Sequence, residues 1–118
     1  ELNILISMGF TKVRAMDSKF NFGDISITRT IDQHGHGDRL TVMGTVSNYV
    51  FQHKSEPTLY WFEDTVFNDS IKENIINFTP IIKVTHSCWA LWSKDEFPVV
   101  MDNRQTWKFV LFHRKQKS

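Results

Sequence analysis

The sequence is poor in cysteine, proline and glycine, with one, three and five of them in 118 residues. Because a disulfide needs two cysteines, a lone Cys88 excludes an internal cross-link and leaves the redox environment open. No apolar run approaches the roughly 20 residues that a membrane-spanning helix needs, which predicts no membrane contact. The net charge is only +1, so composition alone does not demand a polyanionic partner.

Aromatic residues, in contrast, are abundant, with ten Phe, four Trp and two Tyr. Such side chains fit the pleated, half-buried surface of a sheet, and they favour a β-rich core. The length suits one domain. Within residues 1–118 we expect a helical segment over 1–22, a β-rich core over 23–113 and a basic tail over 114–118. An intracellular location is favoured, while oligomeric state, source and any longer parent protein stay open.

The spacing of apolar residues changes along the chain. Leu2, Leu5 and Ile6 recur at helical spacing and predict a helix over residues 2–16. Ser70 followed by Glu73 fits a capping box that begins a short helix, and Pro80 ends it. Alternating or continuous apolar runs predict strands over residues 25–31, 39–52, 58–62, 81–92 and 106–113.

This order of elements predicts a β-rich α+β fold. An N-terminal helix would accompany a curved antiparallel sheet or a partly open barrel with one short helix. Three strands, a helix and further strands resemble the element order of the OB-fold. Gly44, inside the second expected strand, indicates the bend of a curled barrel strand. The alternative is a cone-shaped α+β roll, as in nuclear-transport-factor-like domains.

The segment "DQHGHGDR", residues 32–39, is the most unusual stretch. Its "HGHGDR" resembles the H-x-H-x-D-H run of metallo-β-lactamase-type hydrolases, which would imply a metal site. However, Arg39 stands where that run has its last histidine, and the chain is short for that fold. The segment also resembles the H-x-H of cupins, but Leu40 and Thr41 occupy the places expected for the glutamate.

A turn is the interpretation we adopt for this segment. Zinc needs three or four ligands, and His34 and His36 supply two, so we predict no metal and no cofactor. The glycines and aspartates favour a turn, expected to be exposed and to join the first two strands. Replacing His34 and His36 together with alanine should then change stability by no more than about 0.5 kcal/mol.

Other catalytic arrangements are weak in this sequence. Cys88 and His86 share a strand face, but a free cysteine is more often a small buried apolar residue. Glu63, Asp64 and Asp69 are expected to cap and solvate the short helix. No phosphate-binding loop, nucleophile elbow or H-E-x-x-H motif is present. These observations leave enzymatic activity open but favour a function without catalysis.

The function that these features favour is binding. One hypothesis is an OB-like module for single-stranded nucleic acid, with aromatic rings stacking on bases and basic residues along the backbone. The alternative is a protein-interaction domain of the inhibitor, immunity or complex-subunit type, since interfaces favour aromatic residues and Arg. The expected binding residues are His34, His36, Arg39, Tyr49, Phe51, Lys54, Tyr60, Phe62, Lys94 and Arg104.

Overall fold

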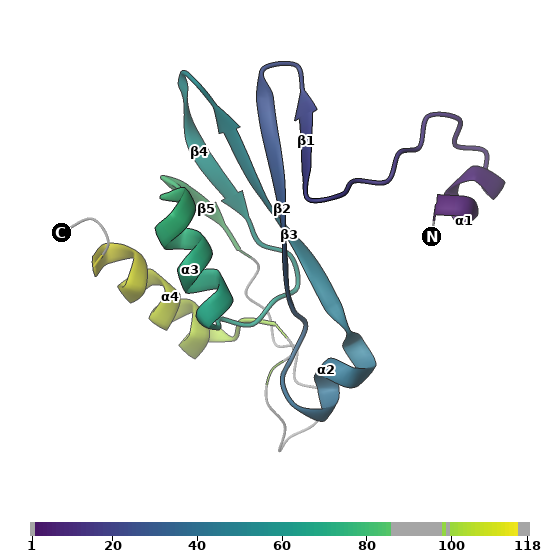
Figure 1. Ribbon diagram of the computed structural model, residues 1–118. Helices are drawn as coiled ribbons and strands as arrows, with labels where there is room; N and C mark the ends of the chain where they lie inside the picture. Colours follow the sequence, from purple (N-terminus) through teal and green to yellow (C-terminus); the bar gives the residue numbers. More distant parts are fainter. Residues whose placement is uncertain (1, 86–97, 99, 116–118) are drawn as a thin grey trace.

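A computed structural model describes residues 2–85, 98 and 100–115. They form an open, mixed sheet of five strands in the order β1-β2-β3-β4-β5 (Figure 1). Neighbouring strands run antiparallel, except that β4 and β5 are parallel. The strands are β1 (Lys19–Phe22), β2 (Ile25–Gln33), β3 (Thr45–His53), β4 (Glu56–Trp61) and β5 (Ile82–Val84); the helices are α1 (Leu2–Ser7), α2 (Asp38–Met43), α3 (Asp69–Phe78) and α4 (Asn103–Lys115).

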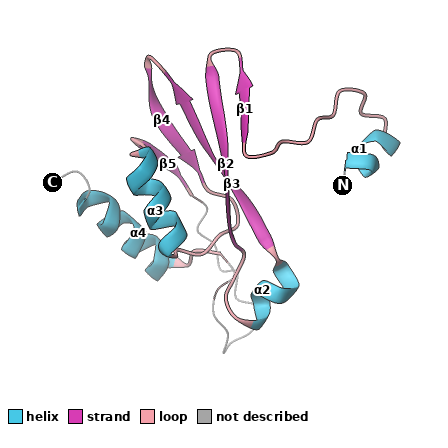
Figure 2. Ribbon diagram, in the orientation of Figure 1, coloured by secondary structure: helices cyan, strands magenta, loops and turns pink. Residues whose placement is uncertain are grey.

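The core lies between the sheet and the two longer helices, α3 and α4, which lie on the same side of it (Figure 2). Phe62 is central, with its ring centroid 4.1 Å from that of Tyr60 and 5.3 Å, edge-on, from that of Phe109. The first pair is tilted by 36°, and the edge-to-face arrangement of the second suits the quadrupoles of aromatic rings. The buried core residues are Val50, Tyr60, Phe62, Ile71, Ile75, Met101 and Phe109.

The helix α3 confirms the predicted short helix, but its cap differs. The side chain of Asn68, not Ser70, accepts a hydrogen bond from the backbone N–H of Ile71, at 3.0 Å. Asparagine satisfies an unpaired N–H at a helix start as serine does. The spacing of Ile71 and Ile75, one helical turn apart, then places both side chains in the core.

The last predicted strand, 106–113, is wrong, because these residues belong to helix α4. Asp102 caps this helix by accepting a hydrogen bond from the N–H of Gln105, at 2.7 Å. Basic residues occupy its last turn, where they complement the helix dipole. The apolar run from Phe109 to Phe112 suits either a strand or a helix, and the cap at Asp102 and the basic last turn favour the helix.

The other predicted elements agree only in part with the structure. The expected strand over residues 39–52 begins only at Thr45, since residues 38–43 form α2. The N-terminal helix ends at Ser7, and β1 was not predicted. Of the expected strand over 81–92, Ile82–Val84 is a strand and residues 86–92 lie outside the described residues. The α+β class is confirmed, but the sheet that the described residues form does not close into an OB-like barrel.

A search of the described helices for one both long and apolar enough to cross a membrane finds none.

Truncation of Phe62 should test this core. Phe62→Ala is expected to lower the free energy of unfolding by about 3–5 kcal/mol, because it leaves a cavity between the sheet and α4. The matched control, Ile76→Ala, removes a side chain of α3 that is 52% exposed, and a change within about 0.5 kcal/mol is expected. Denaturant unfolding measures both. Equal losses in the two variants would contradict the assigned core.

Candidate active site

The histidine loop, residues 33–39, runs from the last residue of β2 into the first turn of α2. Gly35 and Gly37 have φ angles of 95° and 54°, a left-handed region that glycine adopts readily. The N–H of His34 donates to the carbonyl of Gly44, at 3.3 Å, which closes the segment formed by the loop and α2. Both His34 and His36 are half-buried, so the prediction that this connection is exposed is wrong at the two histidines, although Gly37 and Asp38 are exposed.

A buried carboxylate lies directly beneath this loop. Asp32, only 3% exposed, accepts hydrogen bonds from the side-chain amides of Asn48 on β3, at 3.3 Å, and of Asn68 at the start of α3. It also accepts one from the N–H of Gln33, at 2.8 Å. A buried carboxylate is costly unless donors surround it. These contacts connect β2, β3 and α3 at the base of the loop.

The same region is connected to α4 through Thr65. The hydroxyl of Thr65 donates to the carbonyl of Gln33, at 3.2 Å, and the N–H of Val66 donates to that carbonyl at 3.3 Å. The carbonyl of Thr65 in turn accepts from the N–H of Met101, at 2.9 Å. Thr65 is 1% exposed. Thr65 therefore connects the histidine loop to Met101, which lies two residues before α4.

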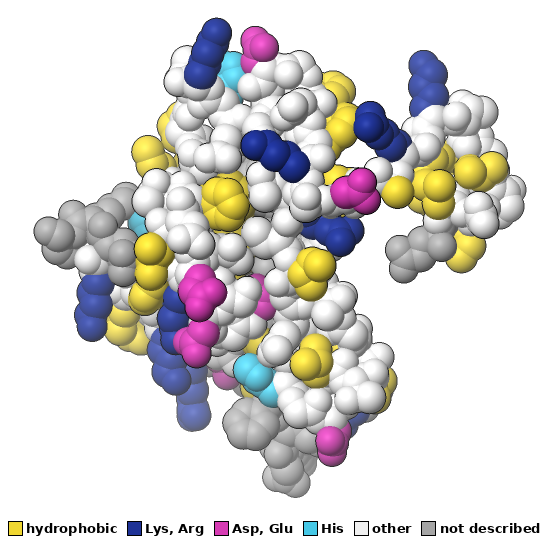
Figure 3. Space-filling model, viewed as in Figure 1, with side chains coloured by type: hydrophobic (Ala, Val, Ile, Leu, Met, Phe, Trp, Pro, Cys, Tyr) yellow, Lys and Arg dark blue, Asp and Glu magenta, His cyan; other side chains and the backbone are white. Residues whose placement is uncertain are grey.

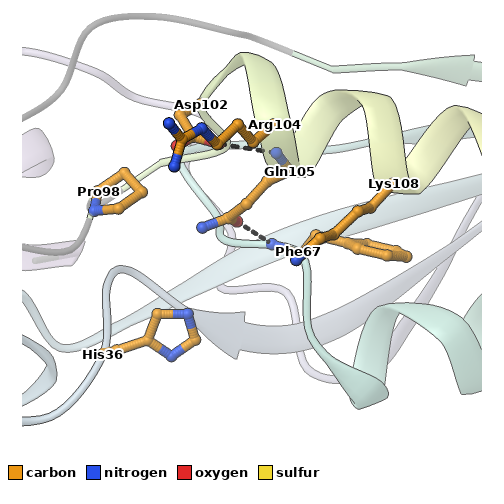
Figure 4. A pocket seen from close by; sticks show the side chains of 7 residues that line it. All are labelled: His36, Phe67, Pro98, Asp102, Arg104, Gln105 and Lys108. Carbon is orange, nitrogen blue, oxygen red and sulfur yellow. Dashed lines mark hydrogen bonds between the residues drawn. The ribbon is translucent and has the colours of Figure 1, made fainter.

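A cavity of about 480 Å³ opens between the histidine loop and α4. Figure 4 shows His36 facing it from the loop, with Gln105 on the helix side. Gln105 is held because its side-chain oxygen accepts a hydrogen bond from the N–H of Phe67, at 2.8 Å. The lining residues are His36, Phe67, Pro98, Asp102, Arg104, Gln105 and Lys108. The cavity thus combines an imidazole with two cationic side chains and one carboxylate.

Of the residues predicted to bind a ligand, the structure brings His36 and Arg104 together at this cavity. His34 and Arg39 belong to the same loop but are not among the residues that line the cavity. Lys54 lies away from it, in the turn that joins β3 to β4. Lys94 lies outside the described residues, as do Cys88 and His86.

The predicted aromatic platform is wrong because of strand register. Tyr49 pairs with Trp61 and Val50 pairs with Tyr60, so Tyr60 points to the core while Tyr49 points to the opposite face. A shift of one residue in register exchanges the two faces of a strand. Tyr60 and Phe62 are fully buried, and the hydroxyl of Tyr60 lies 2.8 Å from that of Thr30. Burial raises the pKa of Tyr60 to about 12. These two rings cannot stack on a ligand.

The polar residues beneath and opposite the loop were not predicted from the sequence. Asp32, Asn48 and Asn68 come from segments that read as strand or turn, and no local pattern joins them. Asp102 and Lys108 were missed because α4 was read as a strand. A weak signal existed for Asp32, since a carboxylate on an apolar strand needs a partner when it is buried.

Comparisons with known proteins give hydrolases as structural neighbours. No family model matches the chain. UPF0173 protein YddR of Bacillus subtilis (strain 168) is 37% identical over 79 residues, which are 66% of this chain and 31% of that protein. An isothiocyanate hydrolase from Delia radicum gut bacteria has a TM-score of 0.81 and 25% identity, over 93% of this chain and 44% of its own. A possible metal-dependent hydrolase from Veillonella parvula DSM 2008 has a TM-score of 0.86 and 21% identity, over 96% of this chain and 45% of its own.

These likenesses overturn the predicted function. The chain shares its fold with hydrolases over nearly its whole length, so the predictions of a non-enzymatic binding module, for single-stranded nucleic acid or as a protein-interaction domain, are wrong. The chain spans less than half the length of these proteins. Its shortness is therefore no longer a reason against a metallo-β-lactamase-type fold.

One neighbour is described as a possible metal-dependent hydrolase, so we tested the donor set for a metal ion. Among residues 2–85, 98 and 100–115, no three His, Cys, Asp or Glu side chains come together to hold one. Asp32, two residues from His34, is surrounded by amide donors instead. The described residues therefore do not fit a metal centre, and the absence of a metal stays a prediction.

The buried carboxylate makes stability depend on pH. Burial raises the pKa of Asp32 above 3.8, against the opposing effect of the hydrogen bond from Asn68. The folded state then holds this proton more tightly than the unfolded state. The contribution of Asp32 to the free energy of unfolding is therefore largest below about pH 3.8 and falls as the pH rises through its folded pKa.

The variant Asp32→Asn tests this pH dependence, because its side-chain amide cannot titrate. The free energy of unfolding of the wild type minus that of this variant should fall across the same window, as measured by urea unfolding at each pH. A difference that is flat or that rises would contradict the raised pKa.

Proposed function

We propose that this chain forms part of the catalytic domain of a hydrolase, with the cavity between the histidine loop and α4 as its active site. The observation that carries the proposal is the position of His36. It comes from a loop that resembles the H-x-H-x-D-H run of metallo-β-lactamase-type hydrolases, and it lines the cavity together with Arg104 and Lys108. The hydrolases among the structural neighbours support this assignment.

The cavity offers two of the functions that hydrolysis needs. Histidine is the residue that most often accepts or donates a proton in catalysis, and His36 would take a proton from the attacking water. Cationic side chains stabilise negative charge that develops on the substrate in the transition state, a role for Arg104 and Lys108. Gln105, held by the N–H of Phe67, would fix the helix side of the cavity.

The substrate class that we propose follows the neighbour named isothiocyanate hydrolase. In an isothiocyanate the central carbon is bonded to nitrogen and sulfur and is electrophilic. The water oxygen would bond to this carbon, one of its double bonds would become single, and the released electron pair would move to nitrogen or sulfur. The proton would pass from water to His36 and then to that heteroatom. The first product would be a thiocarbamate.

Arg39 is where this chain departs from the H-x-H-x-D-H run. A histidine in its place could bind a metal ion, whereas a guanidinium is permanently charged and donates hydrogen bonds only. The loop therefore has one potential ligand fewer than that run. For this reason the proposed mechanism uses proton transfer by His36 and the positive charges of Arg104 and Lys108, and no metal ion.

Replacement of His36 tests the proposed function. His36→Ala should lower the rate of benzyl isothiocyanate hydrolysis by about 100-fold or more, since it removes the proton acceptor. The matched control is His53→Ala, at the far end of β3, where the ring contacts Ser55 and not the cavity. Loss of the ultraviolet absorbance of the substrate measures the rate.

Circular dichroism of each variant separates a catalytic loss from unfolding. No hydrolysis by the folded wild type, or equal rates for wild type and His36→Ala, would contradict the proposal. The metal content of the same purified protein tests the separate prediction that the loop binds no metal.

A further inference from the structure

The α4 wall of the cavity carries two cationic side chains on one face of the helix. Arg104 and Lys108 are four residues apart, so they lie about one helical turn from each other on the same face. Both side chains line the cavity, and both residues are exposed. Figure 3 shows Lys and Arg side chains gathered along the edge of the molecule where α4 lies. Like charges at this spacing destabilise a helix, a cost that an anion bound between them would offset.

The charges of this pair are not neutralised by ion pairs within the described part of the chain. There, neither the side chain of Arg104 nor that of Lys108 forms an ion pair or a hydrogen bond. The carboxylate of Asp102 also lines the cavity, but one of its oxygens accepts the N–H of Gln105 as the cap of α4, at 2.7 Å. With His36 neutral, two cations and one carboxylate leave the described lining with one net positive charge.

Hydrogen-bond donors predominate on the same wall. The side-chain oxygen of Gln105 accepts from the N–H of Phe67, at 2.8 Å, so the NH2 group of this amide remains to donate to a ligand. Arg and Lys side chains are donors only. Figure 4 shows the side chains of Arg104, Gln105 and Lys108 together at the start of α4. A ligand group that fits this wall is one that only accepts hydrogen bonds, as an ionised carboxylate does.

The cavity is larger than the reacting group that it would hold. Its volume of about 480 Å³ lies within the range of roughly 300–1,000 Å³ that small-molecule sites have, whereas an N=C=S group is short and narrow. The rest of the substrate would therefore occupy most of the cavity. When His36 takes the proton of the attacking water, it becomes a cation beside the charge that develops on the substrate. The two cations of α4 can then also bind a charge that the rest of the substrate carries.

We propose that the substrate carries a carboxylate besides its reacting group, and that Arg104 and Lys108 bind this carboxylate. One net positive charge in the lining matches a group with a single negative charge, and a guanidinium can donate two parallel hydrogen bonds to a carboxylate. The apolar body of the substrate would pack on Phe67 and Pro98, which also line the cavity. The inference rests on the proposed function, because it takes the cavity as a substrate site, and it narrows the substrate class to organic acids with an apolar body.

Binding of sodium benzoate and of benzamide, its uncharged counterpart of nearly the same shape, tests the inference without a reaction. Titration of the full chain is followed by the amide chemical shifts in NMR. Benzoate should bind about tenfold or more tightly than benzamide, because hydrogen bonds to charged groups are the stronger ones. Arg104→Gln and Lys108→Gln should each remove most of this preference. The matched control, Lys115→Gln, removes the same charge from the last turn of α4, away from the cavity, and should leave the preference unchanged.

Three results would overturn the inference: no binding of benzoate by the folded chain, equal binding of benzoate and benzamide, or a preference that Lys115→Gln lowers as much as Lys108→Gln does. The last would mean that benzoate responds to net charge and not to the cavity. Hydrolysis of benzyl isothiocyanate is measured on the same samples. Hydrolysis without a preference for benzoate would refute this inference alone, whereas the preference without hydrolysis would refute the proposed function and support a carboxylate site. Circular dichroism confirms that each variant is folded.

Discussion

The candidate active site depends on one buried carboxylate. Asp32 is the last residue before the histidine loop, and its hydrogen bonds connect β2 to β3 and to the start of α3. Asn48 adds a further connection, since its side-chain oxygen accepts from the N–H of Glu63, at 2.9 Å. A buried polar network of this kind is stabilising only when every member has a partner. Loss of any one side chain of this network should therefore disturb the loop that carries His36.

Hydrogen bonds of the neighbouring residue Thr65 also hold the two walls of the cavity, the histidine loop and α4, next to each other. Thr65 bonds to the carbonyl of Gln33 on one side and accepts the N–H of Met101 on the other. The first turn of α4 is thereby fixed relative to the histidine loop, although the two are far apart in sequence. Asp102 and Gln105 use their side chains to cap α4 and to bind the N–H of Phe67. Arg104 and Lys108 are thus presented to the cavity from a helix with a defined start.

The sequence predicted the elements whose patterns are local. The alternation from Ile25 to Ile31 and the spacing of Ile71 and Ile75 identified β2 and α3, because burial on one face repeats at a fixed interval. The run from Phe109 to Phe112 was ambiguous, since a short series of consecutive apolar residues suits strand and helix alike. The decisive signal was Asp102, an N-cap residue that precedes the run.

The site was harder to predict than the elements. His36 and Arg104 were among the predicted binding residues, but the sequence contains nothing that places them at one cavity. The register of the strands could not be predicted either, because alternation alone does not determine which residues of neighbouring strands pair. In the structure Tyr60 pairs with Val50, and both side chains are buried in the core. The function was misjudged because Arg39 and the chain length were weighed above the His34–His36 pair.

The N–H of His34, bonded to the carbonyl of Gly44, reports directly on whether Asp32 holds the histidine loop. Hydrogen exchange of this amide, measured by NMR in the wild type and in Asp32→Ala, is the most direct test. We expect Asp32→Ala to speed exchange at His34 about tenfold or more beyond any change at Val50 in the core, because donors lose their acceptor beneath the loop. Equal changes at the two amides would contradict the claim that the buried carboxylate positions the active-site loop.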